Sequence, residues 1–437
     1  MKRKTNASSK IITVLIVSVA VALSAALFCG VYFSFLNAGA ETPDLAITAE
    51  ANANGGNNPT DGHSAAALIP DVPSGEPEIA DTSEFELNYI RRRFICAGDN
   101  LIHTDVYGAA ARYGSEVGEE YDFLPMFSDI KPLIGEYDYA FLNQEVPIAG
   151  EELGFSGYPC FNSPDELGDA VVDTGFNIVN IATNHMLDKR NIGLKNAVEY
   201  WRKKPVTLIG DYLSKKEYDT IEYIEDSGLK IALLAYTYAT NGITLQNNGD
   251  EYVVPYIDEE DIKEKTARAR LEGANLVFVS IHWGYENTPT PNDEQERLAR
   301  MMADIGVDVV IGHHSHSIQP TMWLDRPDGG KTLVTYSLGN LLSGMQSPIN
   351  IVGGMLSFDV EYFGEGTTPT VNNVKIIPTV CHFSGYPRDY KVYLFTDYTQ
   401  ELAAKHRLAD KVTYKEMKSM VTRTVDGEFL TEEFLEK

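Results

Sequence analysis

From Arg91 onward, short apolar runs alternate with segments that carry the boundary signals of helices. Several of these runs are almost continuously apolar, as is typical of strands that are covered on both faces. Strands and helices that alternate along a chain build a largely parallel sheet, so we expect an α/β domain. The predicted strands are residues 93–97, 139–142, 177–182, 230–235, 276–281, 308–311 and 333–336.

Three of the predicted helices have clear ends. Ser163 has the character of an N-cap, followed by a proline and then by Glu166 at the third helical position, and Gly175 follows the predicted end. The segments 258–272 and 293–305 each stop directly before a glycine. These signals place helices between the strands, as the α/β interpretation requires.

The pattern changes after residue 353. Residues 355–362 and 371–383 are β-rich runs with no helical segment between them. We therefore expect antiparallel strands that complete or flank a second sheet. The tail from residue 397 is charged and has a helical pattern, so we expect it to pack on the outside of the domain.

The N-terminal 36 residues resemble a membrane signal-anchor. Four Lys and Arg residues within 1–10 form a basic flank that we expect to be cytoplasmic, and an uncharged apolar run over 11–36 follows. A helix of roughly 20 apolar residues spans a bilayer, whereas a cleavable signal has an apolar core of about 7–15. Residues 38–40 resemble a cleavage site and keep the cleaved signal open as an alternative. Because the positive charges precede the span, we expect a single-pass cell-membrane protein whose C-terminal domain is extracellular.

Residues 37–88 are predicted to be a disordered acidic linker. The stretch 41–86 holds ten Asp and Glu residues and no Lys or Arg, among Ala, Asn, Gly, Pro and Thr. Such a composition cannot bury enough apolar surface to offset the entropy of ordering the chain.

Charge and cysteine content exclude two classes of protein. The net charge is −27; removing the four positive charges of the flank and the ten negative charges of the linker leaves about −21 for the folded part. A domain this acidic repels phosphate backbones, which argues against nucleic acid as a partner. Cys96, Cys160 and Cys381 are too few for a disulfide framework, although one bridge stays open.

Three of the nine histidines lie within four residues, directly after the apolar run 307–312. A strand that ends in a glycine and a His-x-His pair directs His314 and His316 toward one point above the sheet edge. The neighbouring His313 points the other way in an alternating strand, and we expect it to be structural. Imidazole suits Zn, Mn and Fe at neutral pH. The alternative is a polar loop that happens to be rich in histidine.

Polar side chains follow the other predicted strands as well. In open α/β sheets, ligands bind outside the carboxyl ends of the strands, so these side chains should converge on one crevice. Carboxylate, imidazole and amide ligands together suit Mn, Fe or Zn better than Ca, and one or two such ions would activate water and polarise a phosphoryl or carbonyl oxygen. The candidates are Asp99, Asn143, Glu145, Asn184, His185, Asp188, His282 and Glu286.

These positions also carry a resemblance to a known family. The motifs are Gly98-Asp99, Asn143-x-Glu145, Thr183-Asn184-His185-x-x-Asp188, His282-Trp283-Gly284-x-Glu286, Gly312-His313-His314-x-His316 and Tyr336-Ser337-Leu338-Gly339-Asn340. From about residue 94 to 383, their order and spacing resemble the CapA family of capsule (poly-γ-glutamate) synthesis proteins, which is related to calcineurin-like metallophosphatases. The resemblance implies a four-layer α/β/β/α sandwich with a metal centre over residues 89–385 and a C-terminal helical extension over 386–437.

The resemblance also implies roles for individual residues. Glu145 takes the place of a metal-bridging carboxylate, and His185 takes that of a histidine that protonates the leaving group or steadies the transition state. Asp188 would orient the His185 imidazole, as buried carboxylates commonly do. The implied metal ligands are Asp99, Glu145, Asn184, His282, His314 and His316.

The chain departs from the metallophosphatase pattern at two points. Those enzymes begin with Asp-x-His, but the residue two positions after Asp99 is Leu101. His103 could replace the missing histidine; without it, one metal position lacks a nitrogen ligand, and the site would hold one ion or release its metal readily. The second motif of those enzymes usually ends in Asp, whereas this chain has Asn143-x-Glu145, so the bridging geometry at Glu145 stays open.

Two functions compete at this stage. The first is a membrane-anchored extracellular metal-dependent hydrolase, most simply of phosphoester type, in capsule or poly-γ-glutamate biosynthesis. The second is a non-catalytic polymer-binding or scaffolding subunit of a capsule synthesis or export complex. Either would take a cell-envelope polymer or its precursor as partner, together with subunits of such a complex. The ligand chemistry favours the first function, and the family name favours the second.

Overall fold

The computed structural model describes residues 89–210 and 212–437. The predicted basic flank (1–10), membrane span (11–36) and linker (37–88) lie outside the described residues. Within the described part, no helix combines the length and apolar character that a membrane span requires.

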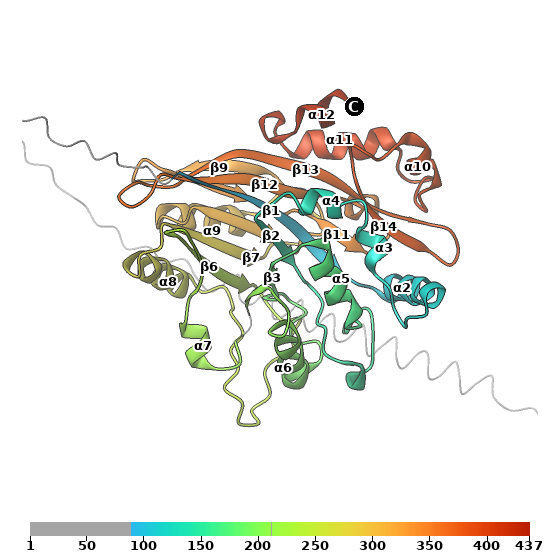
Figure 1. The fold of residues 1–437 in the computed structure, drawn as a ribbon, viewed down its shortest axis with the longest axis horizontal. Coiled ribbons are helices and arrows are strands. Elements are labelled where there is room, and N and C mark those ends of the chain that lie inside the picture. Colours follow the sequence, from blue (N-terminus) through green and yellow to red (C-terminus); the bar gives the residue numbers. More distant parts are fainter. Residues whose placement is uncertain (1–88, 211) are drawn as a thin grey trace, which may run out of the picture. The chain divides into compact units, whose positions relative to one another are not determined.

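Two sheets form the centre of the described domain (Figure 1). The first consists, in spatial order, of β14 (Asp389–Leu394), β13 (Thr370–Ser384), β12 (Val352–Tyr362), β1 (Ile90–Leu101), β2 (Tyr139–Asn143), β3 (Ile178–Asn180) and β4 (Thr207–Ile209), with β11 (Asn340–Ser343) paired to β1. The second consists of β5 (Glu222–Asp226), β6 (Leu229–Thr237), β7 (Leu276–His282), β8 (Val309–His313), β10 (Lys331–Thr335) and β9 (Thr321–Asp325).

Both sheets mix parallel and antiparallel pairs. The strands β1 to β4 run parallel to one another, as do β6, β7, β8 and β10. Each predicted strand corresponds to an observed one, which confirms the mixed α/β class. The late strands β12 and β13 do not form part of a second sheet, because β12 pairs antiparallel with β1 and extends the first sheet.

The two sheets pack face to face. The ring of Phe94 in β1 lies edge-on to that of Phe278 in β7, with centroids 5.5 Å apart, and stacks on Phe358 of β12 at 5.1 Å. On the other face of β7, Val277 and Val279 pack against the helices α8 (Glu259–Leu271) and α9 (Asp293–Asp304). Alternate residues of one strand therefore face the partner sheet and the covering helices.

Further helices pack against the first sheet. α2 (Thr104–Val117) and α3 (Leu124–Phe127) contact β14, α5 (Glu166–Thr174) contacts α3, and α11 (Tyr414–Thr424) contacts β12. Figure 1 shows α8 and α9 beside β6 and β7, and α11 beyond β12 and β13. The described part thus has helices outside, and two sheets inside. The remaining helical segments are α4 (Lys131–Ile134), α6 (Arg190–Trp201), α7 (Lys215–Asp219), α10 (Gln400–Lys405), α12 (Glu432–Glu436) and the 3₁₀ turns Glu151–Leu153, Pro348–Asn350 and Gly427–Phe429.

Two of the predicted helix starts are confirmed and one is wrong. The Asp258 side chain caps α8, and Asn292 forms a capping box at α9. α5 begins only at Glu166, with Asp165 as its N-cap residue and no side-chain cap bond. The predicted cap, Ser163, stays in the preceding loop because its backbone N–H donates to Pro147 O at 3.0 Å.

The predicted helical extension 386–437 begins with a strand. β14 pairs antiparallel with β13, and its alternate residues Tyr390 and Val392 are buried. The predicted boundary at residue 385 therefore falls inside a hairpin of the first sheet, and the helical part starts with α10.

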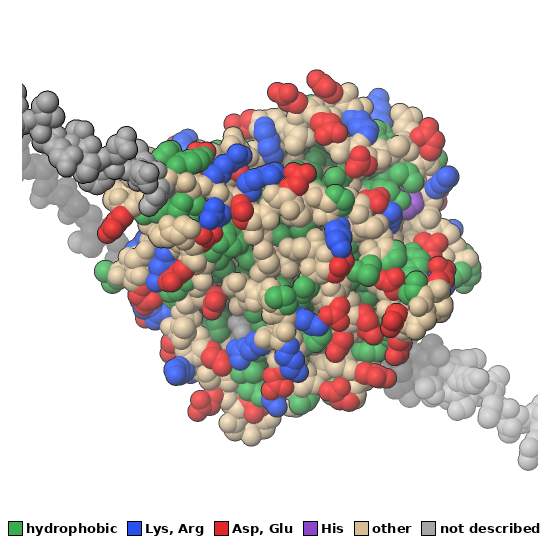
Figure 2. All heavy atoms as spheres, viewed as in Figure 1, with side chains coloured by type: hydrophobic (Ala, Val, Ile, Leu, Met, Phe, Trp, Pro, Cys, Tyr) green, Lys and Arg blue, Asp and Glu red, His purple; other side chains and the backbone are tan. Residues whose placement is uncertain are grey.

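The surface and the cysteines agree with the composition. Figure 2 shows acidic side chains spread over the visible face, with basic side chains between them. Cys96, Cys160 and Cys381 are free thiols, so no bridge forms among the described cysteines.

Candidate metal centre

The predicted ligands lie where neighbouring strands of the two sheets end. Asp99 was expected just past its strand but lies within β1, at an irregularity in the pairing with β2 and β11. The strand continues because Asp99 N donates to Gly339 O at 2.9 Å. A Cβ on Gly98 would stand 2.0 Å from the same oxygen, so only glycine allows this close approach.

The two histidines that follow β8 take an unusual backbone conformation. His314 has a φ of 89° and His316 a φ of 54°, both in the left-handed region. Residues other than glycine rarely adopt this conformation, and in folded proteins such strain clusters at functional sites. The turn directs both imidazoles back over the sheet edge, toward His282 at the end of β7.

The six predicted ligands form one connected cluster. Ligand atoms of Glu145, His314 and His316 all lie within 4.8 Å of one another. Glu145 Oε1 is 3.7 Å from His282 Nε2 and 3.6 Å from His316 Nε2. His282 Nε2 contacts Asn184 Oδ1 at 2.9 Å, and His316 Nδ1 contacts Asp99 Oδ2 at 3.0 Å. Their role as ligands stays a prediction, but the structure brings them together.

Several polar atoms of this cluster lack a partner. Both carboxylate oxygens of Glu145, together with His282 Nδ1 and His314 Nδ1, are buried without a hydrogen bond to any described residue. Burying an unpaired carboxylate is costly, so such a group normally becomes neutral, pairs with a charge or binds a metal. Carboxylate and imidazole are donors that Mn, Fe and Zn accept. The residues present therefore fit a divalent cation.

Burial and neighbouring charges together set the pKa values of the site's titratable groups. Burial raises the pKa of Glu145 well above its usual value and lowers that of His314 to about 3. Burial also acts to lower the pKa of His316, but the charges of Glu145 and Asp99 outweigh it and raise the pKa to about 9. Burial, followed by the neighbouring imidazoles, holds the pKa of His282 well below its usual value. His282 and His314 are therefore neutral, which is the form that binds metals.

The predicted acid and its orienting carboxylate are in contact. His185 Nδ1 lies 2.8 Å from Asp188 Oδ2, and the same oxygen accepts a bond from Phe161 N at 2.7 Å. The Phe161 ring stands edge-on to the imidazole, with centroids 4.7 Å apart. Nδ1 is thus engaged, and Nε2 remains as the nitrogen of His185 that can exchange a proton with a ligand.

A chain of side-chain amides supports Asp99. Asn143 Nδ2 donates to Asp99 Oδ1 at 2.8 Å, and Asn180 Nδ2 donates to Asn143 Oδ1 at 2.7 Å. Asn340 Oδ1 lies 3.1 Å from His316 Nδ1, the same nitrogen that contacts Asp99. Sequence reasoning missed Asn180; the only signal was one buried amide at the end of an apolar strand. It also missed Asn241, which lies in a loop without a motif.

The remaining candidates are His103, His313 and Glu286. His103 Nδ1 accepts a bond from Gly344 N at 3.2 Å, so that nitrogen is not available to a metal. His313 stacks on Phe141 with centroids 5.6 Å apart, and its Nδ1 lies 3.7 Å from Asp99 Oδ1, so it borders the cluster. Neither ring nitrogen of His313 has a hydrogen bond to a described residue, and its structural role stays a prediction. Glu286 is exposed, although its charge acts on both Glu145 and His316.

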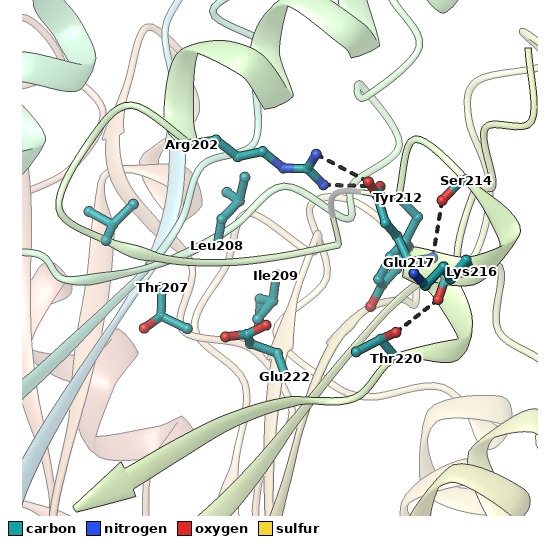
Figure 3. A pocket seen from close by; sticks show the side chains of 11 residues that line it. Arg202, Thr207, Leu208, Ile209, Tyr212, Ser214, Lys216, Glu217, Thr220 and Glu222 are labelled. Atoms are coloured by element: carbon teal, nitrogen blue, oxygen red, sulfur yellow. Dashed lines mark hydrogen bonds and ion pairs between the residues drawn. The ribbon is translucent and has the colours of Figure 1, made fainter.

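A groove of about 540 Å³ lies away from this cluster (Figure 3). It is bordered by β4, α7 and the start of β5, and an ion pair between Arg202 and Glu217 at 3.0 Å crosses its side. None of the predicted ligands lines it. The groove is therefore separate from the candidate metal centre.

A family model and two related proteins match the part of the chain that carries the site. The family model "Bacterial capsule synthesis protein PGA_cap" matches residues 93–345. The chain is 28% identical over 254 residues to "Capsule biosynthesis protein CapA" of Bacillus anthracis, covering 56% of this chain and 58% of that protein. It is 28% identical over 240 residues to "PGA biosynthesis protein CapA" of Bacillus subtilis, covering 53% and 60%. The chain thus spans less than two thirds of the length of each relative.

Solved structures with a similar chain course are more distant. The calcineurin-like phosphoesterase YfkN from Bacillus subtilis has 11% identity and a TM-score of 0.39, covering 77% of this chain and 97% of that one. A 5'-nucleotidase precursor from Thermus thermophilus has 12% identity and a TM-score of 0.42, covering 77% and 58%.

Proposed function

The chain belongs to the PGA_cap family of bacterial capsule synthesis proteins, and on this basis we propose that it is a divalent-metal-dependent hydrolase, most simply a phosphoesterase. Its substrate would be a cell-envelope polymer or its precursor in capsule or poly-γ-glutamate biosynthesis. The proposal includes a four-layer metallophosphatase-like sandwich held outside the cytoplasm by a membrane span over residues 11–36. Subunits of a capsule synthesis complex are the proposed partners.

The observation that carries this proposal is the buried carboxylate of Glu145, whose two oxygens have no hydrogen bond to any described residue. It is 1% exposed, neither oxygen has a hydrogen-bonding partner among the described residues, and imidazole nitrogens of His282 and His316 lie within 4 Å. A purely structural carboxylate would be hydrogen-bonded, because an isolated buried charge costs several kcal/mol. A cation at this point would offset that cost. The residues that would hold it are Asp99, Glu145, Asn184, His282, His314 and His316.

When bound, the cation would act as a Lewis acid toward a phosphoryl oxygen and would activate water. The chain's own contribution to turnover is the pair formed by His185 and Asp188. Asp188 Oδ2 holds Nδ1 of the imidazole at 2.8 Å and so fixes the ring. We propose that Nε2 of His185 gives a proton to the leaving oxygen as its bond to phosphorus breaks, which is general acid catalysis.

A single ion is the simplest occupancy of the site. Leu101 supplies no ligand where metallophosphatases have a histidine, and His103 Nδ1 is bonded to Gly344 N. Ligand atoms of Glu145, His314 and His316 all lie within 4.8 Å of one another and could share one ion. We therefore expect one tightly bound ion at Glu145, His314 and His316.

The same departure favours a second candidate function. If the incomplete ligand set binds metal without turnover, the protein would bind or guide polymer in a synthesis complex. The names of the two relatives describe biosynthesis and not hydrolysis. This function predicts metal uptake without hydrolysis of any phosphoester.

Elemental analysis and hydrolysis of an aryl phosphate by the purified full-length protein test the proposal. We expect stoichiometric Mn, Fe or Zn and measurable turnover of 4-nitrophenyl phosphate. His314→Ala should lose both metal and turnover, whereas His185→Ala should keep the metal and lose turnover. Absence of metal from the wild type, or full turnover in both variants, would refute the hydrolase.

Metal uptake without turnover would favour the binding function. Capsule assays in cells that carry both substitutions then decide, since an intact capsule would show that neither histidine is needed.

A further inference from the structure

Asn241 belongs to none of the motifs described above, yet it contacts two residues of the proposed site. It lies in the connection between β6 and α8, on the second sheet. Asn184 Nδ2 donates to Asn241 Oδ1 at 3.2 Å, and Asn241 Nδ2 lies 3.3 Å from His185 Nδ1. Asn184 and His185 follow β3 of the first sheet. Asn241 therefore reaches across from one sheet to the loop of the other.

The turn that carries Asn241 is closely braced. Asn241 has a φ of 52° and Gly242 a φ of 75°, a left-handed pair that Asn and Gly adopt most readily. Ile243 N donates to Thr240 O at 2.8 Å and closes the turn. Thr240 Oγ1 donates to Ile243 O at 2.6 Å and lies 2.7 Å from Tyr256 Oη. These bonds fix the position of the Asn241 side chain.

The start of the same connection is attached to two predicted ligands. Tyr238 N donates to His282 O at 2.9 Å, and the Tyr238 ring lies 4.5 Å from the ring of His314. Thr237 N donates to Pro255 O at 2.8 Å and holds the two ends of the connection together. The position of the turn is thus set by the ligand strands themselves.

The Asn184 amide is held at both ends. Its nitrogen donates to Asn241 Oδ1, and its oxygen accepts a bond from His282 Nε2 at 2.9 Å. An amide has an oxygen and a nitrogen of nearly the same shape, and only the oxygen can bind a cation. A partner that accepts from the nitrogen therefore decides which atom faces the metal centre.

We propose that Asn241 is a positioning residue of the metal centre. Its Oδ1 turns the Asn184 oxygen toward the cation, and its nitrogen packs against the His185 imidazole. Residues that orient metal ligands in this way typically change metal affinity by about 10–100-fold when they are removed. The inference rests on the proposed function and adds a residue from the second sheet to the same site.

Substitutions at Asn241 test this role in the full-length protein. Asn241→Gly removes the amide and keeps the left-handed turn, so Mn²⁺ affinity should fall about tenfold. Asn241→Asp keeps an acceptor for Asn184 and should bind Mn²⁺ within about threefold of the wild type, since the hydrogen bond survives. The EPR signal of free Mn²⁺ measures both affinities.

Asn373 provides the matched control. It is also an asparagine with a φ of 52°, and its Nδ2 donates to Asp359 Oδ2 at 2.6 Å, on the hairpin of β12 and β13. Asn373→Gly should leave Mn²⁺ affinity unchanged. Circular dichroism checks the fold of each variant, and Asn241→Ser replaces the glycine variant if that variant unfolds.

A second background separates positioning from a general structural effect. In Asn184→Asp both terminal atoms are oxygen, so the orientation set by Asn241 no longer matters. Asn241→Gly should then cost no Mn²⁺ affinity in the Asn184→Asp background. An equal loss in both backgrounds, or wild-type affinity in Asn241→Gly, would overturn the inference while the metal site stands. If the wild type takes up none of Mn, Fe and Zn, the proposed function fails and the inference fails with it.

Discussion

Two groups of buried histidines occur in the described domain, and they differ in what surrounds them. In the metal centre, His282 and His314 each have a buried Nδ1 without a partner among the described residues. The carboxylates of Glu145 and Asp99 lie within 4 Å of imidazole nitrogens in the same cluster. The second group consists of His382 in β13 and His406 at the end of α10, with ring centroids 5.0 Å apart.

In the second group, three of the four ring nitrogens have a hydrogen-bonding partner. His382 Nδ1 bonds to Tyr398 Oη at 2.8 Å, and His406 Nδ1 accepts from Leu408 N at 3.0 Å. His406 Nε2 lies 3.3 Å from Cys381 O. Neither histidine forms an ion pair with a carboxylate of the described residues. Burial alone therefore does not mark a ligand; a ligand is indicated by a buried imidazole close to the Glu145 carboxylate, whose oxygens have no hydrogen bond to any described residue.

The sharpest contrast is expected between His314→Ala and His406→Ala. Loss of His314 removes a ligand, so Mn²⁺ affinity should fall by more than the roughly 100-fold that supporting residues can cost. His406→Ala should lower the melting temperature and leave Mn²⁺ affinity unchanged. Titration calorimetry on both variants checks this, and equal affinities would remove the distinction between the two groups.

His185 provides an intermediate case, since its Nδ1 is paired and the residue is not a predicted ligand. Asp188→Asn leaves the ring without its carboxylate and should lower kcat about 10–100-fold, as supporting residues do. Metal content should stay at the wild-type level. Loss of the metal in this variant would show that Asp188 supports the ligands and not the acid.

The Glu145 carboxylate should lower the stability of the fold when metal is absent and should be required for the stability gained when metal binds. Without metal, the buried Glu145 carboxyl must either take up a proton or stay charged with no hydrogen bond to its oxygens. Glu145→Gln replaces it by a neutral amide, so the free energy of unfolding of EDTA-treated protein should rise by about 1–3 kcal/mol. The same variant should gain no stability from added Mn²⁺, whereas the wild type should. Denaturant unfolding with and without metal measures both terms. If Glu145→Gln unfolds with a lower free energy than the wild type in EDTA, the metal-free carboxyl group does not destabilise the fold.

The smallest expected effect is on the pH dependence of stability, and it comes from His382 in the second group. Burial lowers the pKa of His382 to about 4, below its usual 6.5. As pH falls below 6.5, the unfolded chain binds a proton that the folded chain does not, so stability falls until about pH 4, by roughly 1 kcal/mol per unit. His382→Gln should flatten this dependence between pH 6.5 and 4. Unchanged acid sensitivity would show that His382 is already protonated in the fold.

Most strands and residues of the metal centre could be predicted from the sequence. The apolar runs marked every strand that delivers a ligand, and the residues at the strand ends, such as Asp99 and His282, followed from the rule that ligands bind at the carboxyl ends of strands. The left-handed turn at His314 and His316 was not predicted, but the clustering of histidines after a glycine indicated a close convergence.

Other features depend on contacts that sequence patterns do not encode. β14 is a short edge strand whose alternation covers only Tyr390 and Val392, too few residues to distinguish it from the predicted helical tail. Asn180 and Asn241 act through side-chain hydrogen bonds, such as 2.7 Å to Asn143 and 3.2 Å to Asn184, and no sequence spacing predicts such bonds. Ser163 was misplaced as a cap because its backbone bond to Pro147 outweighs the local signal.

Anomalous X-ray scattering from crystals of the full-length protein grown with Mn²⁺ tests the central claim most directly. We expect a manganese peak among Glu145, His314 and His316, within bonding distance of all three side chains. No peak at that position, or a peak at His382 and His406 instead, would contradict it.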